Sequence, residues 1–177
     1  QDNLADVRNE EGAIYITFLH RLLLELKLMA NDGHRLVPTV RAADWLKQSR
    51  YRQYSDAWNL YKKRGLRDEL TQTNLYVYLQ PSQIIVARGR LLDAVKPCPP
   101  EAWISVSSFV KKVQSDDAYF LRSWRDGSSF LVRDDMGRVL TGQDTWERVE
   151  GYFIRQVIGT LSWLGLVSLD EKGKVFQ

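Results

Sequence analysis

The chain has very little cysteine: Cys98 is the only one in 177 residues. A single thiol cannot form an intramolecular disulfide, so the sequence gives no sign of an oxidising compartment. No apolar run is long enough to span a bilayer, and the first residues lack the apolar segment of a secretory signal. We therefore expect a cytoplasmic protein with no membrane partner.

Residues that carry chemistry are also sparse. The two histidines lie far from Cys98, which argues against a metal site, and no glycine-rich phosphate loop follows a predicted strand. The adjacent carboxylates Asp116–Asp117 and Asp134–Asp135 should point apart on turns, and we interpret them as solvated loop residues. The sequence thus predicts a protein that is not an enzyme and has no cofactor or metal.

The composition is that of a folded domain. Apolar residues make up 44% of the chain and aromatic residues 11%, enough for a sizeable core. The formal net charge is only +3, so the overall charge does not demand a polyanionic partner. Whether the chain binds nucleic acid must therefore be judged from the positions of its basic residues.

The stretch from Trp146 to Val175 organises the chain. Its apolar residues recur every three or four positions, which predicts one buried helix face made by Trp146, Val149, Phe153, Val157, Leu161 and Leu164. Gly165 should end this helix in a left-handed conformation. Two strand-like runs, 166–169 and 174–176, then flank the turn 170–173. A helix followed by a two-stranded ribbon is typical of the second half of a winged-helix module.

The first part of the chain repeats this pattern. A helix over residues 12–28 is followed by a turn at Asp32–Gly33, and Glu25–Met29 corresponds to Trp163–Val167. One face of this helix carries Tyr15, Leu19, Leu22, Leu23 and Leu26, and the nearly opposite side carries Ile14, Leu24 and Leu28. Because it is apolar almost all round, we expect it to be covered on two sides.

The intervening segments complete two units. We expect Thr39 to cap a helix over 40–48 and Ser49 to cap a tyrosine-rich helix ending near 62–65, with a junction at 71–74. In the second part of the chain, the sequence predicts helices over 82–95 and around 107–113 and a short helix within 117–123. It also predicts a hairpin of 130–133 with 138–140, followed by a long helix capped by Asp144 or Thr145. The prediction is a mainly α fold with small β-ribbons (α+β), a tandem winged helix. Its domains are a partial unit over 1–72 and a complete unit with an inserted hairpin over 73–177.

These residues resemble a known group of proteins. The resemblance covers roughly residues 12–175 and rests on Leu26, Leu28, Asp32, Gly33, Leu36, Pro38, Thr39, Trp45, Tyr54, Trp58, Trp103, Ser105, Phe109, Phe120, Trp146, Gly151 and Trp163. The pattern is similar to bacterial tandem winged-helix proteins, related to the winged-helix regions of transcription-repair-type helicases. It implies a DNA-associated or scaffold module within a larger protein. No ATPase motif is present, so helicase activity is not implied for this chain.

The resemblance also shows a departure. The first copy begins at its third helix, without the two helices that normally precede it. Helix 12–28 then needs cover from the second half of the chain, from an upstream domain or from a partner protein. We expect its outward side to contact protein more readily than DNA.

The long helix and its turn carry the predicted site for double-stranded DNA. Opposite the core face, the helix should present Arg148, Gly151, Arg155, Gly159 and Ser162, flanked by Gln156, and the wing adds Lys172 and Lys174. The alternative is that both arginines are solvated and that the glycines let another helix pack closely.

A second basic patch lies on the tyrosine-rich helix and comprises Arg50, Arg52, Lys62, Lys63 and Arg64. It either contacts phosphates or is a solvated helix face with half-buried tyrosines. We expect Trp45, Trp58, Trp103, Trp146 and Trp163 to pack in the core and only Trp124 to be available for stacking. The sequence thus favours a non-enzymatic DNA-binding module, and the alternative is a protein-interaction scaffold.

Overall fold

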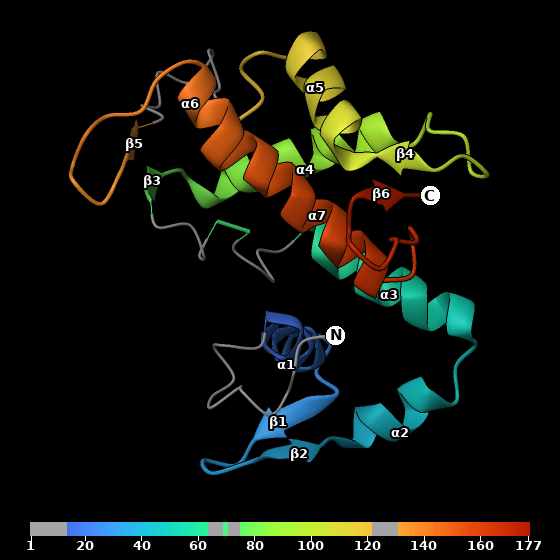
Figure 1. The fold of residues 1–177 in the computed structure, drawn as a ribbon. Helices are drawn as coiled ribbons and strands as arrows, with labels where there is room; N and C mark the ends of the chain where they lie inside the picture. The colour runs from blue at the N-terminus through green and yellow to red at the C-terminus, as the bar shows by residue number, and fades with distance from the viewer. Residues whose placement is uncertain (1–13, 64–68, 71–74, 122–130) are drawn as a thin grey trace. The chain divides into compact units, whose positions relative to one another are not determined.

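The chain folds into two compact units. The computed structural model describes residues 14–63, 69–70, 75–121 and 131–177. Its contacts separate residues 1–67 from residues 68–177. The sequence placed the junction slightly later, between residues 72 and 73, a position that lies outside the described residues. Both units combine helices with short antiparallel ribbons, so the fold class is α+β (Figure 1).

Unit 1 (residues 1–67) is a helix followed by a ribbon and two more helices. Its elements are α1 (Ile14–Glu25), β1 (Met29–Asn31), β2 (Leu36–Pro38), α2 (Val40–Leu46) and α3 (Arg50–Lys63). The ring of Phe18 on α1 packs edge-to-face on Tyr61 of α3, with their centroids 6.2 Å apart. Both side chains are fully buried. This contact holds α1 against α3.

The packing of α1 corrects the predicted face. The buried side is centred on Phe18 and Leu22, whereas Tyr15 is 41% exposed. Leu28 was expected on the opposite side of the helix, but it is buried because the helix ends at Glu25 and the chain turns back before it. When apolar residues continue around a helix, their pattern does not indicate which side of the helix packs against the neighbouring helix.

The two helix-to-ribbon junctions have the same backbone geometry. Lys27 has φ 58°, and the N–H of Leu28 donates to the carbonyl of Leu23 at 2.9 Å. In unit 2, Gly165 has φ 68° as predicted, and the N–H of Leu166 donates to the carbonyl of Leu161 at 2.9 Å. Both are Schellman-type ends, in which a left-handed residue closes the helix. The alignment of 25–29 with 163–167 therefore matches residues in equivalent hydrogen bonds.

Two predicted caps have different outcomes in unit 1. The hydroxyl of Ser49 accepts the N–H of Arg52 at 3.3 Å, so Ser49 caps α3 as predicted. Thr39 precedes α2, but its hydroxyl donates to the carbonyl of Lys27 at 2.7 Å instead of capping the helix. Thr39 therefore ties the ribbon back to the end of α1.

Unit 2 (residues 68–177) is built on one long helix. In chain order its elements are β3 (Tyr76–Tyr78), α4 (Pro81–Val95), β4 (Ile104–Ser105), α5 (Val106–Asp116), β5 (Leu131–Arg133), α6 (Gln143–Thr145), a π-helical turn (Trp146–Glu150), α7 (Gly151–Trp163) and β6 (Val175–Phe176). The six residues of the predicted core face from Trp146 to Leu164 are all buried. Trp146 Nε1 also donates to the carbonyl of Ala118 at 2.9 Å.

The start of the long helix differs from the prediction. Neither Asp144 nor Thr145 caps it, because the helix already begins at Gln143 after Gly142. The hydroxyl of Thr145 is buried and donates to the carbonyl of Gly142 at 2.8 Å. The π turn follows, in which the N–H of Gly151 bonds to the carbonyl of Trp146. Such a turn changes the helical phase between its two sides.

The C-terminal ribbon has a third strand that the sequence did not reveal. β4 pairs antiparallel with β6, so that Ile104 lies opposite Phe176, and Phe176 in turn bridges to Leu169. The ring of Phe176 packs edge-to-face on Phe109 of α5, with centroids 5.2 Å apart. A two-residue strand has no period that sequence reading can detect. β4 thus anchors the ribbon to α5.

The predicted hairpin forms, and it also has an unexpected partner. Residues 131–133 and 138–140 are joined by an Arg133–Val139 bridge and by a bond from the N–H of Leu140 to the carbonyl of Val132. β5 pairs antiparallel with β3, from Tyr76 opposite Arg133 to Tyr78 opposite Leu131. The short helix expected within 117–123 is a turn over the described residues 118–121.

Candidate nucleic-acid interface

The two arginines of the long helix are exposed to solvent. Arg148 lies in the π turn and Arg155 in α7, and both side chains are exposed. Within the described part of the chain, neither guanidinium takes part in an ion pair or a side-chain hydrogen bond. Glu147, next to Arg148, accepts a hydrogen bond from Gln143 at 3.2 Å. The helix therefore presents two uncommitted positive charges to solvent.

The rest of the predicted face is less exposed than the arginines. Gln156, Gly159 and Ser162 are half-buried, and the carbonyl of Gln156 accepts the hydroxyl of Thr160 at 3.0 Å. A Cβ added at Gly159 would meet no atom of the described residues within 4 Å. The backbone at Gly159 is thus open to close approach by another molecule.

Gly151 lies beneath this face, because Nη1 of Arg155 is 3.6 Å from the position that a Cβ at Gly151 would take. It is buried, and a Cβ there would lie 2.9 Å from the carbonyl oxygen of Trp146 and 3.4 Å from a methyl group of Val110 on α5. The π turn brings Gly151 round to α5, which the regular period used for the prediction could not anticipate. At Gly151 the structure therefore agrees with the alternative interpretation from the sequence, in which a glycine of the long helix lets another helix pack closely.

The wing turn is organised by Asp170. Its carboxylate accepts the N–H of Lys174 at 2.6 Å and that of Val175 at 3.0 Å, and its carbonyl accepts the N–H of Gly173. Gly173 has φ 62°, which glycine adopts without strain. Lys172 is exposed, as is Lys174. The turn therefore holds both lysines at the tip of the ribbon.

Hydrogen bonding lowers the pKa of Asp170. The N–H of Val175 is the main cause, desolvation opposes it, and the N–H groups of Lys174 and Lys172 and the charge of Lys174 add to it. The carboxylate therefore stays ionised and continues to accept these bonds well below neutral pH.

Asp134 closes the hairpin turn in the same way. Its Oδ1 accepts the N–H groups of Met136 and Arg138, and its Oδ2 accepts Arg138 Nε at 2.8 Å. Burial raises its pKa, but the backbone and side-chain bonds and the charge of Arg138 outweigh this and leave the pKa lowered. Asp134 is 1% exposed, so the prediction of a solvated loop carboxylate is wrong for it. Because its buried carboxylate accepts three hydrogen bonds, we interpret Asp134 as a residue that stabilises the hairpin turn.

The second basic patch is partly as expected. Arg50, Arg52 and Lys63 are exposed on α3, and the half-buried Lys62 places Nζ 5.1 Å from the centre of the Trp58 ring. Tyr51 is 83% exposed and not half-buried. Arg64 lies outside the described residues.

The tryptophans do not all lie in the core. Trp146 is buried, while Trp45, Trp58 and Trp163 are half-buried. Trp103 is 53% exposed, which contradicts its assignment to the core. It directly precedes β4 and lies in no helix or strand, so the apolar period that supported the prediction does not continue there. Trp124 lies outside the described residues.

A buried ion pair was missed by the sequence reading. Arg88 on α4 donates from Nε and Nη2 to Glu69, and both side chains are fully buried. The signal was present, because Arg88 lies in phase with Ile84, Leu91 and Val95 on the apolar stripe of 82–95. A cation in such a stripe indicates a buried acidic partner. The identity of that partner was not readable from the sequence.

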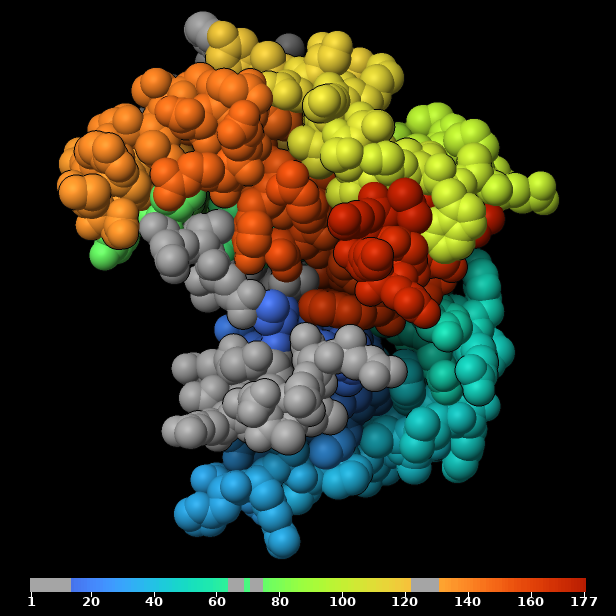
Figure 2. All heavy atoms as spheres, viewed as in Figure 1, coloured from blue at the N-terminus to red at the C-terminus, as the bar shows by residue number. Residues whose placement is uncertain are grey.

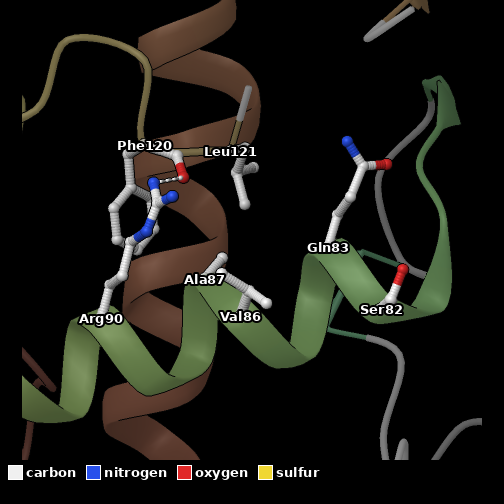
Figure 3. Close-up of a pocket in the computed structure, with 7 residues that line it drawn as sticks. All are labelled: Ser82, Gln83, Val86, Ala87, Arg90, Phe120 and Leu121. Atoms are coloured by element: carbon white, nitrogen blue, oxygen red, sulfur yellow. Dashed lines mark hydrogen bonds between the residues drawn. The ribbon is translucent and has the colours of Figure 1, made fainter. Parts of the chain in front are cut away.

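A small pocket lies between α4 and the segment that follows α5 (Figure 3). Its volume is about 120 Å³, and its lining residues are Ser82, Gln83, Val86, Ala87, Arg90, Phe120 and Leu121. Arg90 is held by Asp117 at 3.0 Å and by the carbonyl of Phe120 at 3.4 Å. Pockets for small molecules usually span roughly 300–1,000 Å³, so this one is small for a cofactor.

The described residues contain neither a metal-binding cluster nor a membrane-spanning helix. No group of three or more histidine, cysteine, aspartate or glutamate side chains in these ranges is arranged to hold a metal ion. Among the described helices, none combines the length and the apolar character needed to cross a membrane.

In unit 2, helix α7 and the C-terminal ribbon form part of one continuous surface (Figure 2). Arg155 belongs to that helix, Arg148 belongs to the π turn directly before it, and the two lysines belong to that ribbon. Comparison with protein-family models, curated proteins and solved structures gave no match to the chain.

Proposed function

We propose that unit 2 is a winged-helix-type module that binds double-stranded DNA and catalyses no reaction. The order of its elements supports this: α4, β4, α5 and the long helix are followed by a ribbon whose last strand pairs with β4. In winged-helix proteins this order places the last helix where it can enter the major groove, with the ribbon beside it.

One observation carries the proposal. Arg148 and Arg155 are exposed on the same helix without an acidic partner in the described part of the chain. Uncommitted arginines contact phosphates and the edges of guanine. The open backbone at Gly159 lets the helix approach closely, Gln156 and Ser162 add hydrogen-bonding groups, and Lys172 and Lys174 contact the backbone beside the groove.

The test is salt-dependent binding to a random-sequence duplex, measured by fluorescence anisotropy. The double variant R148A/R155A should bind more weakly and should lower the slope of log K against log salt by about 2. The control is K96A/K112A, which removes two lysines already paired with Asp93 and Asp116. The proposal fails if the wild type shows no binding at low salt, or if both double variants lose affinity equally.

A protein-interaction scaffold is the second candidate, and exposed apolar side chains of unit 1 favour it. Tyr15 and Ile16 are 41% and 39% exposed on α1, and Val40 on α2 is 87% exposed. Such side chains suit a partner chain or a further domain of a longer protein docking on helix 12–28. Absence of duplex binding at low salt would favour this candidate.

A further inference from the structure

The ribbon of β3 and β5 presents an aromatic face to solvent. Directly paired residues share a face of an antiparallel sheet, so Tyr76 lies beside Arg133 and Tyr78 beside Leu131. The Arg133–Val139 bridge adds Val139 to the same side. We call these five residues, Tyr76, Tyr78, Leu131, Arg133 and Val139, the tyrosine face. On the opposite side Val132 is 1% exposed, so the ribbon has one face in the core and one in solvent.

The side chains of the tyrosine face are free to bind. Tyr76 is 64% exposed and Tyr78 60% exposed, and Arg133 is exposed as well. Within the described part of the chain, none of these three side chains makes a hydrogen bond, an ion pair or a ring contact. Tyr76 and Tyr78 thus form an exposed aromatic surface, whereas large aromatic rings normally bury most of their area.

The spacing of the two tyrosines suits separate bases of an extended strand. Residues two apart on a strand lie about 6.8 Å apart, which is about twice the 3.4 Å rise per nucleotide of a stacked strand. Single-stranded nucleic acids bind by stacking successive bases on aromatic rings beside a positive charge. Each ring is therefore positioned to take its own base.

The charge of this face also favours nucleic acid. Arg133 lies directly across from Tyr76, and none of the five residues is acidic. The next residue, Asp134, is buried and already accepts bonds from Met136 and Arg138. The face therefore offers a guanidinium to a phosphate without a competing carboxylate among its own residues.

We propose that the tyrosine face binds single-stranded nucleic acid, with bases stacked on Tyr76 and Tyr78 and a phosphate on Arg133. The tyrosine face belongs to the ribbon of β3 and β5, whereas the proposed duplex interface belongs to the long helix and the wing, so the two sites share no residue (Figure 1). The proposal goes beyond duplex binding and does not depend on it.

The test measures binding of fluorescein-labelled dT15 to the full chain by anisotropy. Replacing both rings in Y76A/Y78A should weaken binding at least tenfold, whereas Y76F/Y78F should stay within about twofold because the ring faces remain. R133Q should bind more weakly and show a smaller salt dependence. M136A, at the exposed tip of the same hairpin, is the matched control and should bind as the wild type does.

Thermal unfolding of each variant checks that the fold is retained, and a mixed-sequence 15-base-pair duplex separates the two proposed sites. Loss of dT15 binding in Y76A/Y78A with duplex binding retained supports the tyrosine face. No dT15 binding by the wild type, unchanged binding by Y76A/Y78A, equal loss of dT15 and duplex binding, or equal loss in the phenylalanine and alanine variants would each overturn it. Unchanged dT15 binding would leave a protein partner as the occupant of this face.

Discussion

Arg88 and Glu69 form a bidentate ion pair in the interior of unit 2. Arg88 Nη2 lies 2.7 Å from Oε1 and 2.9 Å from Oε2 of Glu69, and both side chains are 0% exposed. Removing both charges from water costs free energy, which is offset only when the geometry of the pair is good. The pair therefore ties α4 to the segment at Glu69 more specifically than an apolar contact would.

Breaking this pair from one side should be costly. R88M leaves the Glu69 carboxylate buried without its main partner, and we expect unfolding free energy to fall by about 3–5 kcal/mol. The double variant E69L/R88M should recover much of this loss, because no buried charge remains. Urea unfolding followed by circular dichroism measures both. If the double variant were no more stable than R88M, the uncompensated charge would not be the cause.

The two glycines of the long helix should respond oppositely to alanine. In G151A the new Cβ meets the carbonyl oxygen of Trp146 at 2.9 Å, and overpacking of this kind costs about 1–3 kcal/mol. In G159A the Cβ enters open space, and removing a mid-helix glycine should stabilise the fold by up to about 1 kcal/mol. Thermal unfolding distinguishes them. Destabilisation by G159A to the same extent as G151A would contradict this account.

The two helix ends make a matched pair. Lys27 occupies a left-handed conformation with φ 58°, so K27G should stabilise unit 1 by up to about 1 kcal/mol. Gly165 occupies the equivalent position with φ 68°, and G165A should destabilise unit 2 by about 1 kcal/mol. Chemical denaturation of the two variants measures both effects. Changes of the same sign would mean that these ends are not equivalent.

Acid should weaken the turns of unit 2. The pKa of Asp170 is lowered by the N–H of Val175 before its other donors, and the pKa of Asp134 is lowered despite burial by its bonds from Arg138. A lowered folded-state pKa stabilises the fold above the unfolded-state value of about 4, and that contribution is lost as pH falls toward the folded-state pKa. We expect the unfolding midpoint to be flat from pH 7 to 5 and to fall below pH 4.

The control for this pH dependence is D170N, which cannot titrate at this position. Its unfolding midpoint should fall less steeply below pH 4 than that of the wild type, although it should be lower at pH 7. A wild-type midpoint that rises on acidification would contradict the assigned direction of both pKa shifts.

Features that depend on local period and turn chemistry could be predicted from the amino-acid sequence. The buried stripe from Trp146 to Leu164 follows from the helical period, and the end at Gly165 follows from the freedom of glycine at positive φ. The hairpin around Asp134 and the cap at Ser49 are likewise local. Each depends on residues within a few positions of one another, so the chain shows them directly.

Features that join distant segments became visible only in the folded chain. The pairing of Tyr76 with Arg133, the pairing of β4 with β6 and the bond between Arg88 and Glu69 all link residues far apart in sequence. The π turn at Trp146 also turned Gly151 toward α5, against the regular helical period. Such contacts are chosen by the packing of a whole unit, because side-chain volume, burial and charge must be satisfied together, and no local pattern contains that information.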